Sequence, residues 1–360
     1  MKSVRFALLA LLALPAAMAQ EKLVGGPYVV GAGPRSATVA WVVETGRATL
    51  GTEPGKAEKT APALRAEKIT FTGLDAGKTY YYDINGTPAG KGSFKTPPLA
   101  EGGNAPYEFV VYGDTRTRHD VHRLVIAGIL KFAQPDFILH TGDQVADGYD
   151  PSLWPIFFDI ERELLRKTAF YPSTGNHERN SPQWYDFFNQ TSAYYSFNWG
   201  NSHFSIINTD IGNIGPGPET RQRYWDEQVK WLRDDLEKNQ RADFRFVVGH
   251  HPPLTAVTSR QGDNVHMAAL MPMLQTYRVT AGLFGHDHNY QHYLKGAVHY
   301  FVTGGGGAPL YDVEKPPEGI TKKVAKTENF LVLKVNGKSL RIEARKPDGE
   351  TIDVTEILAK

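Results

Sequence analysis

The chain has two stretches that differ in how hydrophobic and polar positions alternate. Over residues 28–96, short alternating or β-branched runs, such as residues 37–43 and 79–84, are separated by turns that contain glycine. From Tyr107 onwards, short apolar runs alternate with segments of helical periodicity. The first pattern predicts a small β-sandwich, and the second predicts a layered α/β domain.

The apolar runs of the second stretch are rich in β-branched or aromatic residues and are closely followed by glycine, which is typical of strands. They cover residues 107–112, 136–140, 169–173, 244–248 and 281–284. The first run precedes a predicted helix, whose apolar face is formed by Val121, Leu124, Val125, Ile129 and Phe132. Strands dominate again from His299, including residues 330–335 and 339–345.

A segment rich in proline and glycine separates the two stretches. Thr-Pro-Pro at residues 96–98 is followed by Glu-Gly-Gly-Asn-Ala-Pro at residues 101–106, and such a composition is typical of a linker. We therefore expect a β-sandwich over residues 20–98, a linker over 99–106, and an α/β domain with C-terminal strands over 107–360.

A residue that can bind metal follows each of five predicted strands, and a glycine precedes it every time. Open α/β sheets build their sites at the carboxyl ends of strands, and glycine lets the backbone turn sharply beside an ion. We therefore expect these side chains to converge. They are Asp114, Asp143, Asn176, His177, His250, His251, His286, Asp287 and His288.

Asp, Asn and His together offer oxygen and nitrogen ligands, which suit Mn, Fe or Zn better than Ca or the soft metals. More than four candidate ligands exceed the needs of one tetrahedral ion, whereas two ions that share a carboxylate fit the count. Two ions ~3.5–4 Å apart can generate hydroxide at neutral pH and stabilise the attacking and leaving oxygens of a phosphoryl group.

The amino-acid composition excludes several kinds of metal site and catalytic nucleophile. The 360 residues include no cysteine, which excludes thiolate metal sites, iron–sulfur clusters and a cysteine nucleophile. All 12 histidines lie at or after His119, so an imidazole site must lie in the last two thirds of the chain. The net charge of +1 gives no reason to expect nucleic acid or an acidic membrane as partner.

The first residues are typical of a targeting segment. Lys2 and Arg5 precede an apolar run over residues 6–17, and Ala17-Met18-Ala19 matches a cleavage signal. The run is shorter than the ~20 residues of a membrane-spanning helix. We expect a signal peptide over residues 1–19 and, after cleavage near Ala19, an exported protein (periplasmic or secreted) without a membrane anchor.

The ordered motifs G-D, G-D, G-N-H-E, G-H-H-P and G-H-D-H resemble those of the calcineurin-like metallophosphoesterases over about residues 107–307. The most similar branch is that of the purple acid phosphatases, whose N-terminal domain is fibronectin type III-like; residues 74–82 and 93–98 resemble a strand and the exit linker of that domain. The resemblance implies a four-layer α/β sandwich of sheets flanked by helices, preceded by a small all-β immunoglobulin- or fibronectin-like sandwich.

The resemblance also implies a set of six metal ligands. Asp114, Asp143 and His288 would hold the first metal, with Asp143 bridging to the second. The second site would be completed by Asn176, His250 and His286. The choice of His250 over His251 follows the H-x-P spacing of the branch, which His250-His251-Pro252 satisfies. The catalytic residue that the resemblance implies is His177, beside the substrate, where it would stabilise the transition state or protonate the leaving oxygen.

The chain departs from this branch at one ligand. The branch has the motif G-D-x-x-Y, whose tyrosine binds Fe(III) and gives the colour, whereas residues 142–146 read Gly-Asp-Gln-Val-Ala. Because Ala146 cannot ligate, we expect two divalent ions (Fe, Zn or Mn) and a colourless enzyme. A tyrosinate charge-transfer band in the visible spectrum of the metal-replete protein would contradict this expectation. The D-x-H variant of the first motif is also absent, because Arg116 occupies its third position.

Other residues near the motifs have two interpretations each. Arg116 either clamps the substrate phosphate bidentately or forms a salt bridge to a ligand carboxylate. His122 either replaces the missing ligand or packs in a helix. His251 and His266 fall where the branch places substrate-contacting histidines, and we expect one of them to be functional.

Weaker candidates lie at the margins of the motifs. His292 is close enough to His288 to line the same cleft, and Asp147 is a candidate to orient His177. The predicted strand positions of three further histidines favour packed, hydrogen-bonded core residues; these are His140, His203 and His299.

The resulting functional hypothesis is an exported enzyme that hydrolyses phosphate monoesters through attack by a hydroxide held between two metals. Its partner would be a small phosphate ester, and its oligomeric state stays open. Two alternatives remain: a phosphodiesterase on the same site, or a non-catalytic exported binding protein that keeps the fold.

Overall fold

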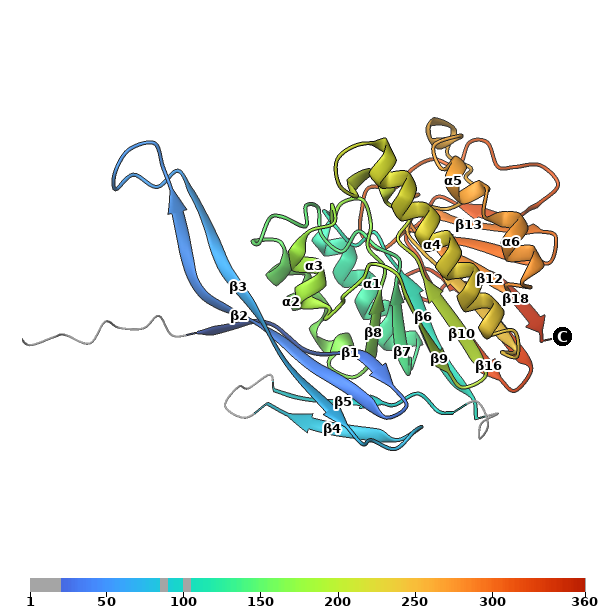
Figure 1. The fold of residues 1–360 in the computed structure, drawn as a ribbon, viewed down its shortest axis with the longest axis horizontal. Coiled ribbons are helices and arrows are strands. Elements are labelled where there is room, and N and C mark those ends of the chain that lie inside the picture. Colours follow the sequence, from blue (N-terminus) through green and yellow to red (C-terminus); the bar gives the residue numbers. More distant parts are fainter. Residues whose placement is uncertain (1–20, 85–89, 100–104, 360) are drawn as a thin grey trace, which may run out of the picture.

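Two stacked β-sheets form the centre of the protein, and helices cover their outer faces (Figure 1). The computed structural model describes residues 21–84, 90–99 and 105–359. Separate hydrophobic clusters lie between the two sheets and between each sheet and its helices. The order of layers is therefore helix, sheet, sheet, helix, as the family resemblance implied.

The first sheet has nine strands, of which β6, β7 and β8 run parallel to one another. In spatial order the strands are β18 (Thr351–Leu358), β17 (Ser339–Arg345), β16 (Phe330–Asn336), β6 (Tyr107–Tyr112), β7 (Phe137–His140), β8 (Ala169–Pro172), β1 (Lys22–Gly33), β2 (Ser36–Leu50) and β3 (Lys59–Thr72). The parallel trio places three carboxyl ends side by side.

The second sheet has seven strands, and its central strands β10, β11, β12 and β14 are parallel to their neighbours in that group. In spatial order the strands are β15 (Thr321–Ala325), β13 (Tyr290–Lys295), β14 (Val298–Thr303), β12 (Ala281–Phe284), β11 (Phe244–Val248), β10 (Ser202–Ile206) and β9 (Tyr195–Trp199). Each sheet thus has a parallel centre with antiparallel strands at its margins.

The outer helices use one apolar face each. The helices are α1 (His119–Phe132), α2 (Trp154–Leu165), α3 (Pro182–Phe187), α4 (Pro218–Lys238), α5 (Val265–Ala268) and α6 (Met271–Thr276), with 3₁₀ turns η2 (Ile211–Asn213) and η3 (Thr258–Arg260). On α1 the buried face centres on Val125 and Ile129, whereas Leu124, which we predicted to be on this face, is 61% exposed. Within the described residues, the structure has no helix of the length and hydropathy needed to span a bilayer.

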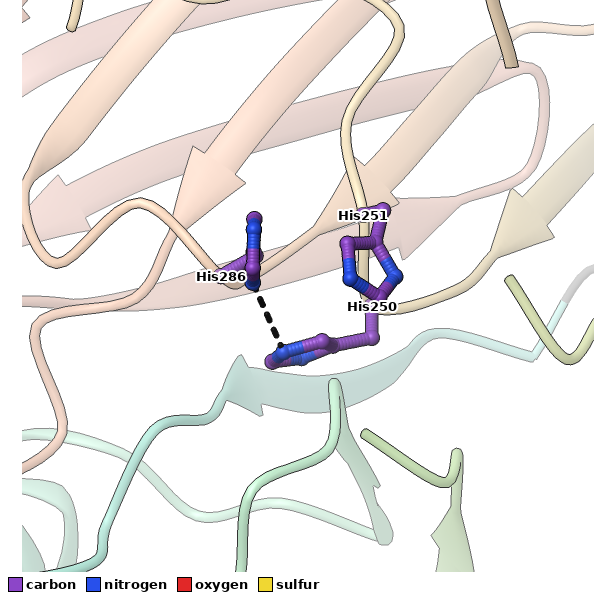
Figure 2. Close-up of side chains that lie close together, drawn as sticks. All are labelled: His250, His251 and His286. Carbon is purple, nitrogen blue, oxygen red and sulfur yellow. Dashed lines mark hydrogen bonds between the residues drawn. The ribbon is translucent and has the colours of Figure 1, made fainter. Parts of the chain in front are cut away.

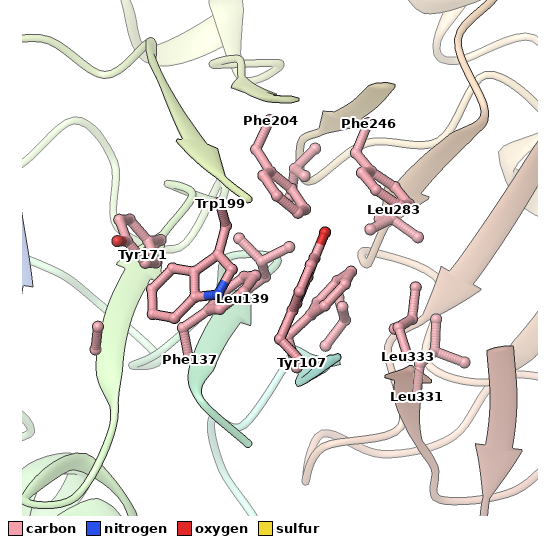
Figure 3. Packing of buried hydrophobic residues seen from close by; sticks show 14 of the residues in the cluster. Tyr107, Phe137, Leu139, Tyr171, Trp199, Phe204, Phe246, Leu283, Leu331 and Leu333 are labelled. Atoms are coloured by element: carbon pink, nitrogen blue, oxygen red, sulfur yellow. The ribbon is translucent and has the colours of Figure 1, made fainter. Parts of the chain in front are cut away.

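The core between the sheets follows from the two-residue period of the strands. Phe109 and its neighbours on β6 alternate, so that Phe109 points to the second sheet while Val110 points to the helices. The ring centroids of Phe109 and Phe204 lie 5.3 Å apart in an edge-to-face contact. The ring centroids of Phe137 and Trp199, both drawn in Figure 3, lie 4.4 Å apart. Each such fully buried ring contributes roughly 1.5–3 kcal/mol, which fixes one sheet on the other.

The N-terminal strands do not form the separate fibronectin-like sandwich that we expected over residues 20–98. β1 pairs in parallel with β8 through Val29 and Val30, so that β1, β2 and β3 extend the first large sheet. The reason is that β1 is apolar on both faces: Tyr28 and Val30 pack against the helical layer, and Val29 faces the core between the sheets. A strand buried on both faces belongs inside a sheet.

The hairpin of β4 (Thr79–Asp83) and β5 (Lys91–Lys95) forms a small sheet of its own. Its Tyr80, Tyr82 and Phe94 pack onto the cluster that lies between the two large sheets. This hairpin is a short second layer over the N-terminal strands, while the far ends of β2 and β3 extend from the body as an exposed arm (Figure 1). The signal peptide expected over residues 1–19 and most of the linker expected over 99–106 lie outside the described residues.

Candidate metal centre

The carboxyl ends of strands from both sheets meet at one edge of the protein. Asp114 and Asp143 follow β6 and β7 of the first sheet, whereas His250, His286 and His288 follow β11 and β12 of the second. The sequence of each strand explains the arrangement, because a buried apolar run stops at a glycine and the next side chain turns into the gap. All six predicted metal ligands lie at this edge.

The first group of side chains is acidic and completely buried. The ligand atoms of Asp114, Asp143 and His288 lie within 4.8 Å of one another, and His288 Nε2 is 3.4 Å from Asp114 Oδ1. Among the described residues, Asp114 Oδ1 has no hydrogen-bond partner although it is buried. A buried carboxylate oxygen without a donor is costly unless a cation neutralises it.

The second group consists of imidazoles from two loops. Figure 2 shows His250 and His251 on one loop and His286 on the other, with a contact of 3.2 Å between His286 Nδ1 and His250 Nε2. The amide oxygen of Asn176 lies 3.0 Å from His250 Nε2 and 3.1 Å from His286 Nδ1. Four potential ligand atoms therefore surround this second position.

Asp143 lies between the two groups. Its Oδ1 is 3.4 Å from His250 Nε2, while its Oδ2 is 3.3 Å from Arg116 Nε and 4.0 Å from His177 Nε2. The carboxylate is therefore close to both groups, which is the position that the family resemblance implied for a bridging ligand.

Hydrogen bonds to backbone carbonyls determine which ring nitrogen of His250 and of His288 is free to bind a metal. His250 Nδ1 lies 2.8 Å from the carbonyl of Thr141, and His288 Nδ1 lies 2.7 Å from that of Pro309. Because a carbonyl oxygen only accepts, Nδ1 carries the proton in both rings and Nε2 keeps its lone pair for a metal. The tautomers are thus set for ligation.

The backbone at the ligands is held in an unusual conformation. Asp114, Asp143 and His286 have φ angles of 58°, 58° and 68°, in the left-handed region that costs a non-glycine residue ~1 kcal/mol or more. The neighbouring glycines allow the close approach: a Cβ on Gly175 would lie 2.3 Å from Asp143 Oδ1, and one on Gly285 would lie 2.4 Å from Asp114 Oδ2. Strain of this kind clusters at functional sites.

The local electrostatics favour the charged form of the Asp143 carboxylate and the neutral form of the His286 imidazole. Burial raises the pKa of Asp143, but His250, His177 and Arg116 outweigh it and hold that pKa below its usual range. Burial, together with the nearby His251, lowers the pKa of His286 far below its usual value. A charged carboxylate and a neutral imidazole are the ligand forms of these residues. The residues present therefore fit a pair of divalent ions with oxygen and nitrogen ligands.

Two predicted catalytic residues flank the acidic group. Arg116 Nε donates to Asp143, and Arg116 Nη2 lies 3.5 Å from His288 Nε2. This geometry agrees with the interpretation that Arg116 forms a salt bridge to a ligand carboxylate. The His177 side chain is 31% exposed, and its Nδ1 donates to the carbonyl of Ala146 at 2.7 Å, which leaves Nε2 directed at the centre. Both side chains can therefore reach a ligand bound over the ligand cluster.

The structure separates the two histidines between which the sequence left the choice open. His251 belongs to the imidazole group, with its ring centroid 4.1 Å from that of His286, and its Nδ1 lies 2.9 Å from the Thr209 hydroxyl. His266 is one step further out, because its Nε2 is bound to the carbonyl of Thr209 and its ring packs on Trp225. His251 is thus the better placed of the two.

The structure decides three weaker sequence interpretations, and for His122 it agrees with packing in a helix. His122 does not reach the centre, because it is buried in α1 and bound to Glu161 at 2.7 Å. Asp147 pairs with Arg179 and does not orient His177. His292 does not face the ligands as expected, because Asp353 and His299 engage both of its ring nitrogens.

The three histidines assigned to the core are fully or partly buried and hydrogen-bonded. His140 faces Thr115, His203 lies 2.8 Å from Asp235, and His299 lies 2.9 Å from His292. These rings stay within the protein framework.

Sequence reasoning missed Glu178, the last residue of the G-N-H-E motif. Its buried carboxylate accepts hydrogen bonds from the backbone N–H groups of Asp143, Val145 and Gly175. Burial and the nearby Asp143 raise the pKa of Glu178. Glu178 ties the second and third motif loops together, and the signal for it was an acidic residue directly beside a predicted ligand pair.

Known proteins resemble this chain in sequence over much of its length. The sequence model described as calcineurin-like phosphoesterase matches residues 94–290, more than half of the chain. The chain is 26% identical over 316 residues to tartrate-resistant acid phosphatase type 5 of Homo sapiens, covering 72% of this chain and 94% of that protein. It is 25% identical over 247 residues to purple acid phosphatase 7 of Arabidopsis thaliana, covering 59% and 74%.

Solved structures share the fold. Purple acid phosphatase PPD1 from yellow lupin (Lupinus luteus) superposes with a TM-score of 0.70 at 16% identity, covering 92% of this chain and 74% of that one. PhoD superposes with a TM-score of 0.65 at 12% identity, covering 94% and 90%. At these identities the likeness concerns the fold alone.

Proposed function

This chain belongs to the calcineurin-like phosphoesterase family, and we propose that it is an exported phosphatase that hydrolyses phosphate monoesters with two divalent metal ions. The observation that carries the proposal is the position of Asp143 between an acidic group with an unpartnered Asp114 oxygen and an imidazole group. Two bound ions would supply Lewis-acid activation of water and of the phosphoryl oxygens. Fe, Zn and Mn suit this ligand set.

In the proposed reaction, water attacks phosphorus in line with the ester oxygen. The new P–O bond forms as the bond to the alcohol breaks, and the alcohol oxygen takes a proton. The protonated form of His177 can supply that proton from Nε2, which lies at the margin of the centre while Nδ1–H is anchored to the carbonyl of Ala146. The proton lost by the attacking water passes to the solvent. The exposed side of His177 leaves room for the alcohol portion.

Arg116 supports the preference for monoesters. The site contains two ligand carboxylates against the four positive charges of two divalent ions, and the Arg116 guanidinium adds a further positive charge 3.3 Å from Asp143. A monoester is a dianion when fully ionised, so it gains more from this excess than a singly charged diester does. A guanidinium that keeps part of its donor set free can also bind phosphate oxygens.

The test compares p-nitrophenyl phosphate with bis-p-nitrophenyl phosphate on metal-replete protein, with elemental analysis of the same sample. We expect two divalent ions per chain, faster release from the monoester, and no release by the Asp143→Ala variant. Faster release from the diester would make the protein a phosphodiesterase. No release from either ester with both ions bound would favour a binding protein that keeps the fold.

Export is supported by the basic start, the apolar run over residues 6–17 and the Ala17-Met18-Ala19 signal. The expected result is a mature protein that begins at Gln20 and is recovered outside the cytoplasm. Intact-mass measurement of protein from the secreted or periplasmic fraction checks this. Full-length protein confined to the cytoplasm would contradict it.

A further inference from the structure

A cavity of about 210 Å³ lies beside the metal centre, between the first turns of α1, the start of α2 and the loop after β7. Thr117 and Ala146 are exposed at its margin, and Leu153 is half-buried. Val145 and Phe157 are both 2% exposed and form its deeper wall. The cavity is therefore open on the side of the loops that carry the ligands and closed by apolar side chains behind.

The margin of the cavity touches both groups that flank the centre. The carbonyl of Ala146 accepts the Nδ1–H of His177 at 2.7 Å, and Arg116 Nη1 donates to the Thr117 hydroxyl at 3.2 Å. A phosphoryl group held by Arg116 and His177 would therefore have its ester substituent next to this opening.

The residues that line the cavity determine which kind of ester substituent can bind in it. Leu153, Val145 and Phe157 offer only hydrocarbon surface. The imidazole of His122, which also lines the cavity, has its Nε2 paired with buried Glu161 at 2.7 Å. The other polar lining residues are His119, Thr117, whose hydroxyl is bound by Arg116, and Gln144, whose Nε2 donates to the Ser173 carbonyl and whose Oε1 has no partner among the described residues. A charged or sugar-like substituent would lose more water here than these few groups replace, whereas an apolar ring would gain burial against the hydrocarbon wall. The volume suits a group of about the size of a phenyl ring.

We propose that this cavity binds the leaving-group portion of the substrate, so that the enzyme prefers phosphate esters of aryl or compact apolar alcohols. The inference rests on the proposed monoesterase function. It adds a specificity-determining residue, Leu153, which contacts the alcohol portion and takes no part in the bond exchange.

The test measures the ratio of kcat/KM for phenyl phosphate to kcat/KM for glycerol 2-phosphate. In the wild-type protein we expect a ratio well above one. Leu153→Trp fills the cavity, and we expect the ratio to fall by roughly tenfold to hundredfold, the loss that follows from denying burial to one ring. Leu124→Trp is the matched control, because Leu124 is 61% exposed on α1 and does not line the cavity.

A second variant and a binding measurement guard against a folding artefact. Leu153→Ala enlarges the cavity and should raise the ratio of 2-naphthyl phosphate to phenyl phosphate hydrolysis. Calorimetry with phenylphosphonate and methylphosphonate, which are not hydrolysed, should show that Leu153→Trp weakens binding of the first far more than of the second. Equal losses for both esters and both phosphonates would overturn the inference while the proposed function stands. Wild-type protein that hydrolyses neither ester would overturn both.

Discussion

Two clusters of histidine in this protein differ in what their ring nitrogens face. In the metal centre, His250 and His288 each give one N–H to a backbone carbonyl and turn the other nitrogen towards ligand oxygens. In the second cluster, His292 has Nδ1 2.7 Å from Asp353 and Nε2 2.9 Å from His299. Both clusters are buried, and both combine imidazole with carboxylate.

The difference teaches how a ligand histidine can be told from a packed one. The rings of the centre leave a lone pair directed at a place where other lone pairs converge, so a cation completes the arrangement. The nitrogens of His292 are both engaged, and the Tyr290 hydroxyl donates to the same Asp353 at 2.8 Å. The second cluster therefore links β13 and β14 of one sheet to β18 of the other and needs no ion.

The variant with the largest expected effect tests whether the histidines of the metal centre, and not those of the second cluster, are needed for activity. His250→Ala removes a proposed ligand nitrogen next to Asp143, and we expect kcat for p-nitrophenyl phosphate to fall on the order of 10³-fold or more, with bound metal falling from two ions towards one. Steady-state kinetics and elemental analysis of the same preparation check both values.

The matched variant is His292→Phe, which keeps a ring against Phe301, 4.2 Å away in the native stack. We expect two bound ions and activity within a few-fold of the wild type. If this variant lost its metal as His250→Ala does, the two clusters would not be distinct in function.

The convergence of the proposed ligands was predictable because their signal is local. Asp114 and Asp143 each stand next to a glycine at the end of a buried run, and that pattern is complete within a few residues. The exclusion of His292 from the centre was not predictable, because its carboxylate partner Asp353 lies 61 positions further along the chain. Sequence spacing from His288 shows nearness but not whether a ring nitrogen is already engaged.

The fold shows the same division between local and distant information. The parallel strands of the catalytic layers were visible in apolar runs such as residues 107–112 and 244–248, which match β6 and β11. The N-terminal strands were visible as strands, but their pairing was not, because β1 joins β8 far along the chain. The pattern of apolar and polar residues shows which residues lie on each face of a strand. It does not show which other strand will pair with that strand, because pairing depends on residues far away in the sequence.

A second prediction concerns the charge that distinguishes the centre. Arg116→Met keeps much of the side chain volume and removes the guanidinium beside Asp143. We expect kcat/KM for the monoester to fall by about 10- to 100-fold, with a much smaller loss for the diester, because the dianion depends more on the excess positive charge. Kinetics with both nitrophenyl esters measure the ratio. An equal loss for the two esters would assign Arg116 only to holding Asp143.

Metal removal should affect stability through the centre alone. A ligand present at 100 times its dissociation constant stabilises the folded state by about 2.7 kcal/mol, so chelation of two such ions should lower the Tm of a chain of this length by about 5–10 °C. We expect the same decrease in His292→Phe and a clearly smaller one in His250→Ala. Differential scanning calorimetry with and without a chelator measures it. An undiminished shift in His250→Ala would place the stabilising ion elsewhere.

The smallest expected effect is a pH dependence that belongs to the second cluster. Burial, then His292 and Lys322, lowers the pKa of His299 to about 4 from its ordinary 6.5, against the opposing effect of Asp353. The unfolded chain therefore takes up the proton first, so His299 contributes stability that is present above about pH 6.5 and is lost as the pH falls towards 4.

We expect His299→Phe to flatten the fall in unfolding free energy between pH 7 and pH 5, as measured by urea denaturation of the chelated protein. Chelation removes the contribution of metal binding to the pH dependence. The remaining difference in slope between His299→Phe and the wild type therefore reports on the protonation of His299. An unchanged slope would mean that His299 is protonated equally in both states and that this cluster is less tightly packed than its hydrogen bonds indicate.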